Sequence, residues 1–372
     1  MANLTRALIF LFVFMLGIKG LGDGFGLLGA DLLEGFFLVT ENPFLALMVG
    51  ILTTSMVQSS SVTTALIVAL VAAPENPLPV ANAVPMIMGA NFGTSVTNTI
   101  VALAHAGHKE EFKRAFAVST CDDFFELCSL SVLLPLEIAT GFIQRTAEYL
   151  AQGLAGTGGL DYQGPVKVAL EFTWAQIYRL VDWALPISEQ ALGGVLIIIA
   201  GVCIYAGLIS LVKLLRTRMK SKAAAAVNWA LNRVALVGML VGLVVTVIVQ
   251  SSSVTTSLLV PLAGAGILTL EQAFPVVLGA NLGTTMTALL AAMATTGPYA
   301  VAGLTIALVH FVYNMTGIIF IYSIPAVRKI PLALSRWVAD LADKSVAWAI
   351  AFTALLFYGL PALVAYLSGM FS

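Results

Sequence analysis

The sequence predicts an all-α polytopic membrane protein built from two inverted-topology repeats. Hydrophobic residues make up 59% of the chain and charged residues 10%, and the mean hydropathy is +0.98, values typical of a chain that crosses a bilayer several times. The stretch Gln-Ser-Ser-Ser-Val-Thr-Thr occurs at residues 58–64 and again at 250–256. Each copy is followed by Gly-Ala-Asn-x-Gly-Thr, at residues 89–94 and 279–284. Two motifs in the same order at nearly the same spacing indicate an internal duplication.

The first repeat covers residues 1–137. After an N-terminal span, the polar motif interrupts an apolar stretch whose two flanks are each too short for the roughly 20 residues that cross a bilayer. We therefore expect a re-entrant hairpin with the motif at its tip. The elements predicted after the first span are a hairpin at 44–72, a broken span at 81–104 and a span at 113–137.

The second repeat covers residues 191–325 and follows the same scheme. It is predicted to contain a span, a hairpin at 227–266, a broken span at 270–296 and a span at 300–324. Residues 138–190 are of mixed composition and predict an extracytoplasmic or interfacial loop that contains an amphipathic helix at 166–185. Residues 326–372 predict a basic loop and a C-terminal helix.

The number of crossings sets the relative orientation of the repeats. Each repeat crosses three times, so the second enters from the opposite face, as in carriers with inverted repeats. With a cytoplasmic N-terminus, most of the 18 basic residues fall in cytoplasmic segments, in agreement with the positive-inside rule. The two hairpins then enter from opposite faces, and we expect their tips to meet near the middle of the membrane.

Polar residues at membrane depth are costly unless they line a cavity or are buried in protein. Hydroxyl, amide and carbonyl oxygens suit a small hard cation such as sodium, and helix N-termini can hold an anion. Neither motif contains a basic residue, so co-bound cations would have to balance a bound anion. The motifs thus predict a coupled cation and oxyanion site, without a cofactor and with sodium as the only metal.

The motifs resemble those of the type II sodium-dependent inorganic phosphate cotransporters. The resemblance rests on the two Gln-Ser-Ser-Ser repeats, the run from Gly89 to Thr99, and Asp123-Phe124-Phe125 ahead of Val132 to Glu137. It implies a secondary active symporter that imports phosphate by alternating access, in the bilayer of a bacterial cytoplasmic (inner) membrane. Whether the chain forms a homodimer stays open.

The resemblance also implies roles for residues of the motifs. Gln250, Ser251, Thr284 and Thr287 match sodium-binding positions, and the two tips match phosphate-contacting positions. The expected phosphate contacts are Gln58, Ser59, Ser60, Ser61, Asn91, Ser251, Ser252 and Asn281. The expected sodium ligands are Gln250, Ser251, Thr284, Thr287, Thr94 and Asp123.

Asp123 matches an aspartate that electrogenic members use for an additional sodium ion. HPO₄²⁻ carried with three Na⁺ is therefore expected. The chain departs from the family beside it, because Asp122 and Glu126 stand where His and Asn are common. The second repeat keeps that pair as His310 and Asn314, which leaves the stoichiometry open.

Three alternatives remain at this point. A sodium symporter of another tetrahedral oxyanion such as sulfate would use the same chemistry. A channel or a scaffold would explain the repeats by helix packing alone. An enzyme with a serine nucleophile needs a neighbouring base, but neither motif contains His or Lys and no GxSxG occurs, so we predict that the chain is not an enzyme. The net charge of −1 gives no reason to expect a nucleic acid partner.

Overall fold

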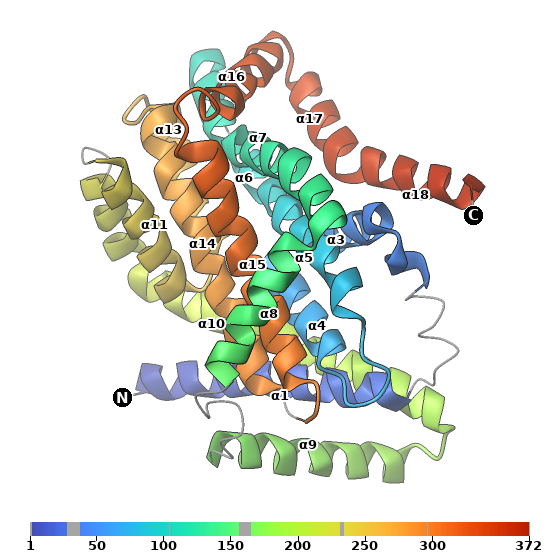
Figure 1. Cartoon of the computed structure of the whole chain (residues 1–372). Helices are drawn as coiled ribbons and strands as arrows, with labels where there is room; N and C mark the ends of the chain where they lie inside the picture. Colours follow the sequence, from blue (N-terminus) through green and yellow to red (C-terminus); the bar gives the residue numbers. More distant parts are fainter. Residues whose placement is uncertain are drawn as a thin grey trace.

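A computed structural model describes residues 2–27, 38–103, 105–155, 165–230, 234–295 and 297–371, and these residues form helices and connecting turns without a strand (Figure 1). Among them, four helices are long and apolar enough to cross a membrane, and a fifth crossing is added if one bent helix pair counts as a span. The four are Glu189–Leu211, Leu270–Ala294, Ala300–Tyr322 and Val346–Val364. The predicted fold class, an all-helical polytopic membrane protein, is confirmed at this level.

The first half contains a long N-terminal helix, two short helices around the first motif, and an interrupted helix. These are α1 (Ala2–Leu27), α3 (Pro43–Val57), α4 (Ser60–Val71), α5 (Val80–Phe92), a 3₁₀ turn (Gly93–Ser95), α6 (Val96–Leu103) and α7 (Lys109–Thr140). The Asn42 side chain caps α3 by accepting a hydrogen bond from the Phe44 N–H, as an N-cap residue should. The 3₁₀ turn lies where the sequence predicted a broken span.

The segment predicted at 138–190 as a loop with one amphipathic helix contains two helices where the structure describes it. α7 ends at Gly141, whose φ of +62° terminates the helix. α8 (Phe142–Ala155) then leaves at an angle of 73° and packs against α15. The Glu137 carboxylate accepts hydrogen bonds from the Ile143 and Gln144 N–H groups, which satisfies the free donors at the start of α8. α9 (Pro165–Ala184) follows.

The second half differs from its prediction in three places. Its elements are α10 (Glu189–Ala230), α11 (Ala235–Val249), α12 (Ser252–Ser257), α13 (Leu259–Gly264), α14 (Leu270–Ala294), α15 (Ala300–Gly317) with a π-turn (Ile318–Tyr322), α16 (Lys329–Lys344), α17 (Val346–Ala354), a second π-turn (Leu355–Gly359) and α18 (Leu360–Phe371). The predicted hairpin therefore begins at Ala235 and not at residue 227, because α10 continues to Ala230. The predicted basic loop is largely α16, which buries one apolar face.

The break predicted within the span at 270–296 is also absent, because α14 is one continuous helix. Gly279 and Gly283 are used for contact with α11 instead. A methyl group on Gly279 would collide with the Met239 carbonyl oxygen, and one on Gly283 would collide with Thr246. Small residues at such positions let helix backbones approach closely without a break.

The same close packing occurs in both halves. Gly50 and Gly89 bring α3 and α5 together, and Gly242 and Gly279 do so for α11 and α14, since a methyl group at any of the four would strike a carbonyl of the opposite helix. Further along the same pairs, Gly93 lies against Thr54. Later residues of one helix contact later residues of the other, so the two helices of each pair run parallel. The short helices between them, α4 in the first half and α12 with α13 in the second, must therefore run in the opposite direction.

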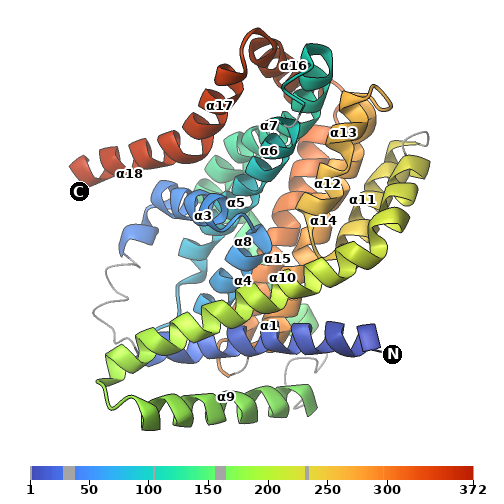
Figure 2. The same ribbon diagram turned by 180° about the vertical axis from the view of Figure 1, so that it is seen from behind.

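The helices are arranged as an upright group with other helices crossing one end. α14 and α15 stand side by side, while α1 and α9 run across their lower ends (Figure 1, Figure 2). α1 packs along α10, and α10 passes obliquely over the group in Figure 2. α17 and α18 extend from the opposite end.

Candidate functional site

Each polar motif sits where one helix ends and another begins. Gln58 and Gln250 have φ values of +58° and +56°, the left-handed conformation that ends α3 and α11. The next residue caps the following helix: the Ser59 Oγ accepts from the Val62 N–H, and the Ser251 Oγ accepts from the Val254 N–H, each at 3.3 Å. The repeated sequence thus produces the same local backbone twice.

The two glutamine side chains are held in the same way. The Thr97 hydroxyl donates to the Gln58 Oε1 at 3.2 Å, and the Thr287 hydroxyl donates to the Gln250 Oε1 at 3.1 Å. Each amide nitrogen donates to a backbone carbonyl of the preceding turn, that of Ser55 or Val247. Thr97 is absent from the predicted site residues, although the duplication pairs it with Thr287 and could have identified it.

The two tips line one small cavity of about 70 Å³. A single water molecule needs roughly 10–15 Å³ of such space, so the cavity has room for a small ion. The lining residues are Gln58, Ser59, Ser60 and Ser61 from the first motif, Gln250, Ser251, Ser252 and Ser253 from the second, and Leu208 and Ile209 from α10. The predicted meeting of the tips is therefore present in the structure, with α10 covering one side.

The part of the lining that the two motifs contribute is polar and uncharged. It combines hydroxyl and amide oxygens, which can bind a cation, with the first turns of α4 and α12, whose N–H groups lack partners inside their own helices. Ser60, Ser61 and Ser252 are nearly buried. The cavity can therefore hold a cation and an anion only by means of dipoles and partial charges.

Asn91 and Asn281 do not line this cavity. They lie in a buried network between α5, α7, α14 and α15. The Asn91 Nδ2 donates to the Glu126 Oε1 at 2.7 Å, and the Asn281 Nδ2 donates to the Asp122 Oδ1 at 2.7 Å and to the Glu126 Oε1 at 3.1 Å. Their donors are thus directed at carboxylates, which are poor neighbours for an anion such as phosphate.

The centre of this network is the Glu126 carboxylate, which is fully buried. Besides the two asparagines it accepts a hydrogen bond from the Tyr313 hydroxyl at 3.0 Å. The His310 Nε2 lies 3.0 Å from the Asn91 Oδ1. Glu126 therefore joins helices of both repeats through neutral donors. Sequence reasoning singled out Asp122, Glu126 and His310, but it missed Tyr313, which carries no distinguishing pattern.

The remaining predicted sodium ligands are spread over three helical segments. The Thr284 hydroxyl donates to the Ala280 carbonyl and the Thr94 hydroxyl to the Ala90 carbonyl, so each occupies an equivalent place in its repeat. Asp123 is 1% exposed on α7. In the described part of the chain, no three His, Cys, Asp or Glu side chains are placed to hold a metal ion.

One further bond joins the two repeats beside the tips. The Thr256 hydroxyl, on α12, donates to the Asn98 Oδ1, on α6, at 2.9 Å. Both side chains are buried. A residue of the second motif is thus tied directly to the segment that follows the first break.

Comparison with known proteins relates most of the chain to a single family. The family model described as "Na+/Pi-cotransporter" matches residues 13–158 and 206–363. Human sodium-dependent phosphate transport protein 2B is 31% identical over 98% of this chain and 65% of its own length. The bovine 2B protein is 32% identical over 97% of this chain and 64% of its own length, and the rat 2A protein is 34% identical over 95% and 66%.

The chain spans slightly less than two thirds of the length of these relatives. No solved structure matches it. A family of cotransporters confirms the prediction that the chain is not an enzyme. The duplicated motifs, the helical fold and these matches agree, and the chain belongs to the Na⁺/Pi-cotransporter family.

Proposed function

We propose that the chain is a sodium-coupled symporter that imports inorganic phosphate by alternating access. The observation that carries the proposal is the cavity at which both motifs meet. A site built from equivalent tips of two repeats is the arrangement expected of secondary transporters, whose substrate sites lie at the repeat interface. The two ions are taken from the relatives, which are named sodium-dependent phosphate transport proteins.

Phosphate is proposed to bind at the tips through Gln58, Ser59, Ser60, Ser61, Ser251 and Ser252. The serine hydroxyls and the first-turn N–H groups of α4 and α12 supply donors. The lining has no Arg or Lys, although a positively charged side chain is the usual partner of a tight phosphate. Bound sodium must therefore supply the compensating charge, which makes the coupling of the two ions a consequence of the composition of the site.

Sodium is proposed to bind to Gln250, Ser251, Thr284 and Thr287, with Thr94 and Asp123 as further ligands. Geometry supports Gln250 and Thr287, because the Thr287 hydroxyl already contacts the Gln250 amide oxygen. Asp123 supplies a buried carboxyl group on α7 for an additional ion. Three Na⁺ with HPO₄²⁻ would move one net charge, worth about 2.3 kcal/mol for each 100 mV of membrane potential.

The repeats are proposed to be inverted, with the N-terminus in the cytoplasm of a bacterium and the chain in its inner membrane. Two features support inversion: the equivalent tips meet at one cavity, and the basic residues are distributed as the positive-inside rule requires. Access to the cavity from alternate sides would then require movement of one half relative to the other.

The test is uptake of labelled phosphate into proteoliposomes that contain the purified full chain. An inward sodium gradient should drive transient accumulation, and an equal potassium gradient should not. Accumulation should increase when the interior is made negative. Uptake that is linear and unsaturable, or indifferent to sodium, would contradict the symporter and favour a channel or scaffold.

Competition identifies the anion. Arsenate, which shares the charge and protonation chemistry of phosphate, should inhibit uptake, whereas sulfate should not. Inhibition by sulfate at similar concentrations would identify the broader class of tetrahedral oxyanions as substrates. A matched variant pair, Ser251→Ala at the cavity and Ser188→Ala on the exposed segment before α10, distinguishes loss of a ligand from loss of folded protein.

A further inference from the structure

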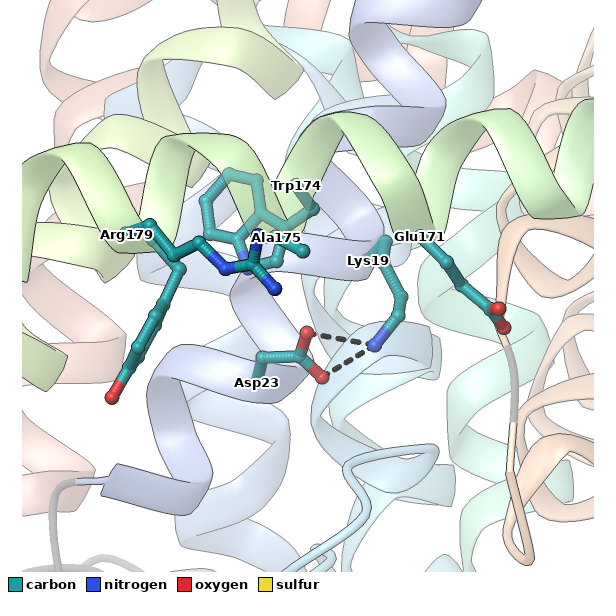
Figure 3. Close-up of a pocket in the computed structure, with 7 residues that line it drawn as sticks. Lys19, Asp23, Glu171, Trp174, Ala175 and Arg179 are labelled. Atoms are coloured by element: carbon teal, nitrogen blue, oxygen red, sulfur yellow. Dashed lines mark hydrogen bonds and ion pairs between the residues drawn. The ribbon is translucent and has the colours of Figure 1, made fainter.

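A second cavity lies outside the proposed transport site, between α1 and α9, and has a volume of about 310 Å³. It is lined by two basic side chains, Lys19 and Arg179, two acidic ones, Asp23 and Glu171, and the aromatic rings of Trp174 and Tyr178. Figure 3 shows the Lys19, Asp23 and Arg179 groups near one another beside the Trp174 ring, with the Glu171 carboxylate further along α9, on the far side of Lys19. The cavity thus presents both signs of charge on an aromatic floor.

The floor of this cavity is fixed by close packing. Trp174 is 2% exposed, and its ring lies so close to α1 that a methyl group on Gly20 would collide with it. On α1, the Lys19 ammonium and the Asp23 carboxylate form an ion pair at 2.6 Å one turn apart. α1 therefore contributes the Lys19–Asp23 ion pair, which carries no net charge, and Gly20, against which the indole ring packs.

The opposite wall carries two charges that are not used within the described part of the chain. Arg179 and Glu171 are exposed, and neither forms an ion pair with another described side chain. They lie two turns apart on α9, a separation of about 12 Å between backbones, which their long side chains can shorten. A ligand that carries one negative and one positive group matches this wall better than a simple anion does.

The surface next to these charges is apolar. Val168, Phe172 and Trp183 lie on the same face of α9 as Arg179, with Phe172 66% and Trp183 83% exposed. The opposite face of α9 is buried through Leu170 and Trp174. A helix with an exposed apolar stripe and Trp near its end is typical of one that lies in the membrane interface. The charged cavity therefore lies beside a surface suited to the level where hydrocarbon and headgroups meet.

We propose that this cavity binds the headgroup of a zwitterionic phospholipid with a primary ammonium group, such as phosphatidylethanolamine. The phosphodiester is placed at Arg179, which forms planar, charge-assisted hydrogen bonds with phosphate oxygens. The ammonium group donates to the Glu171 carboxylate, since Asp23 is already paired with Lys19. The acyl chains lie along Phe172 and Trp183. A trimethylated ammonium group has no N–H donor, so phosphatidylcholine fits the acidic side less well.

The test measures lipid binding to the purified full chain by native mass spectrometry. The protein is offered equal amounts of phosphatidylethanolamine, phosphatidylcholine and phosphatidylglycerol with identical acyl chains. Phosphatidylethanolamine should be retained preferentially. Arg179→Gln should lower its retention about tenfold, which corresponds to about 1.4 kcal/mol. Glu171→Gln should remove the preference over phosphatidylcholine. Arg145→Gln, an exposed position on α8, is the matched control and should change nothing.

Several results would overturn the proposal. Equal retention of the three lipids would show that the cavity does not read the headgroup, and preference for phosphatidylglycerol would indicate a plain basic surface. Retention unchanged in Arg179→Gln would remove the assigned phosphate contact. Displacement of the bound lipid by millimolar inorganic phosphate would identify the cavity as a site for the free anion. Because the readout is lipid binding, failure here is separate from failure of phosphate uptake.

Discussion

Replacement of Gln250 with glycine separates the backbone role of this residue from its side-chain role. Its φ of +56° lies in the left-handed region, which costs a residue with a side chain roughly 1–2 kcal/mol and costs glycine almost nothing. The substitution also removes two hydrogen bonds, with Thr287 and with the Val247 carbonyl, each worth about 0.6 kcal/mol within a membrane. Gain and loss nearly cancel, so the folded state should keep its stability.

Function should respond differently, because the amide oxygen is a proposed sodium ligand. Loss of about 1 kcal/mol of binding energy corresponds to a roughly fivefold rise in the sodium concentration that half-saturates phosphate uptake. The thermal midpoint of the purified variant should shift by less than about 4 °C. Both quantities are measured on one preparation, by thermal unfolding in detergent and by uptake in proteoliposomes.

The matched control is Asn76→Gly. Asn76 has a φ of +48° in an exposed turn outside both motifs, so it undergoes the same relief of backbone strain without the loss of a ligand. Its sodium dependence should equal that of the unmodified chain. A folded Gln250→Gly protein with normal sodium dependence would refute the assignment of Gln250, and a drop in midpoint far beyond 4 °C would refute the cancellation.

Three other substitutions test the packing and the buried network. Gly279→Ala should reduce the yield of monodisperse protein, because overpacking against α11 costs about 1–3 kcal/mol. Gly194→Ala should be harmless, because an added methyl group there meets no other described residue within 4 Å; equal yields of the two variants would contradict the packing. Glu126→Gln replaces a carboxylate that accepts three hydrogen bonds with an amide in which one of the two acceptor oxygens becomes a donor nitrogen. The thermal midpoint of this variant should fall, whereas that of the control Glu75→Gln, in an exposed turn, should not. Asp123→Asn should abolish the net current during phosphate uptake and leave some uptake, as recorded on supported membranes; a persistent current would exclude Asp123 as the ligand of the extra ion.

The polar tips were predictable because their signal is local and occurs twice. Seven identical residues at 58–64 and 250–256 encode a left-handed glutamine followed by a serine cap, a conformation fixed by neighbours in the chain. The hairpin arms were predictable for a similar reason, since their lengths follow from where the polar residues interrupt the apolar runs. The meeting of the tips followed from topology.

Of the two helices between the repeats, α9 was expected at 166–185, but α8 was not predicted. α8 lies in a stretch of mixed composition, but Ile143, Ala147 and Ala151 recur at helical spacing and are all fully buried. That stripe was available in the sequence and indicates a packed helix. What the sequence did not contain is the partner, α15, because nothing local specifies which distant helix an apolar stripe will contact.

The placement of the asparagines shows the same limit for polar residues. Asn91 and Asn281 stand beside residues that resemble a substrate site, and their amides are suited to an anion or a carboxylate alike. The choice is made by α7, which brings Glu126 to both of them and Asp122 to Asn281. The position of α7 next to α5 and α14 determines that the two amides face carboxylates, and no residue near either asparagine in the sequence specifies that position.

The glycine contacts of α3 with α5 and of α11 with α14 have a mechanical consequence. Where two backbones touch without an intervening layer of side chains, a shear of even one residue would drive a side chain into a carbonyl. The two helices of each parallel pair therefore resist sliding past each other and move together as one rigid unit. Any movement between the arms of a hairpin must therefore occur outside these contacts, and the chain reverses direction at Gln58 and Gln250.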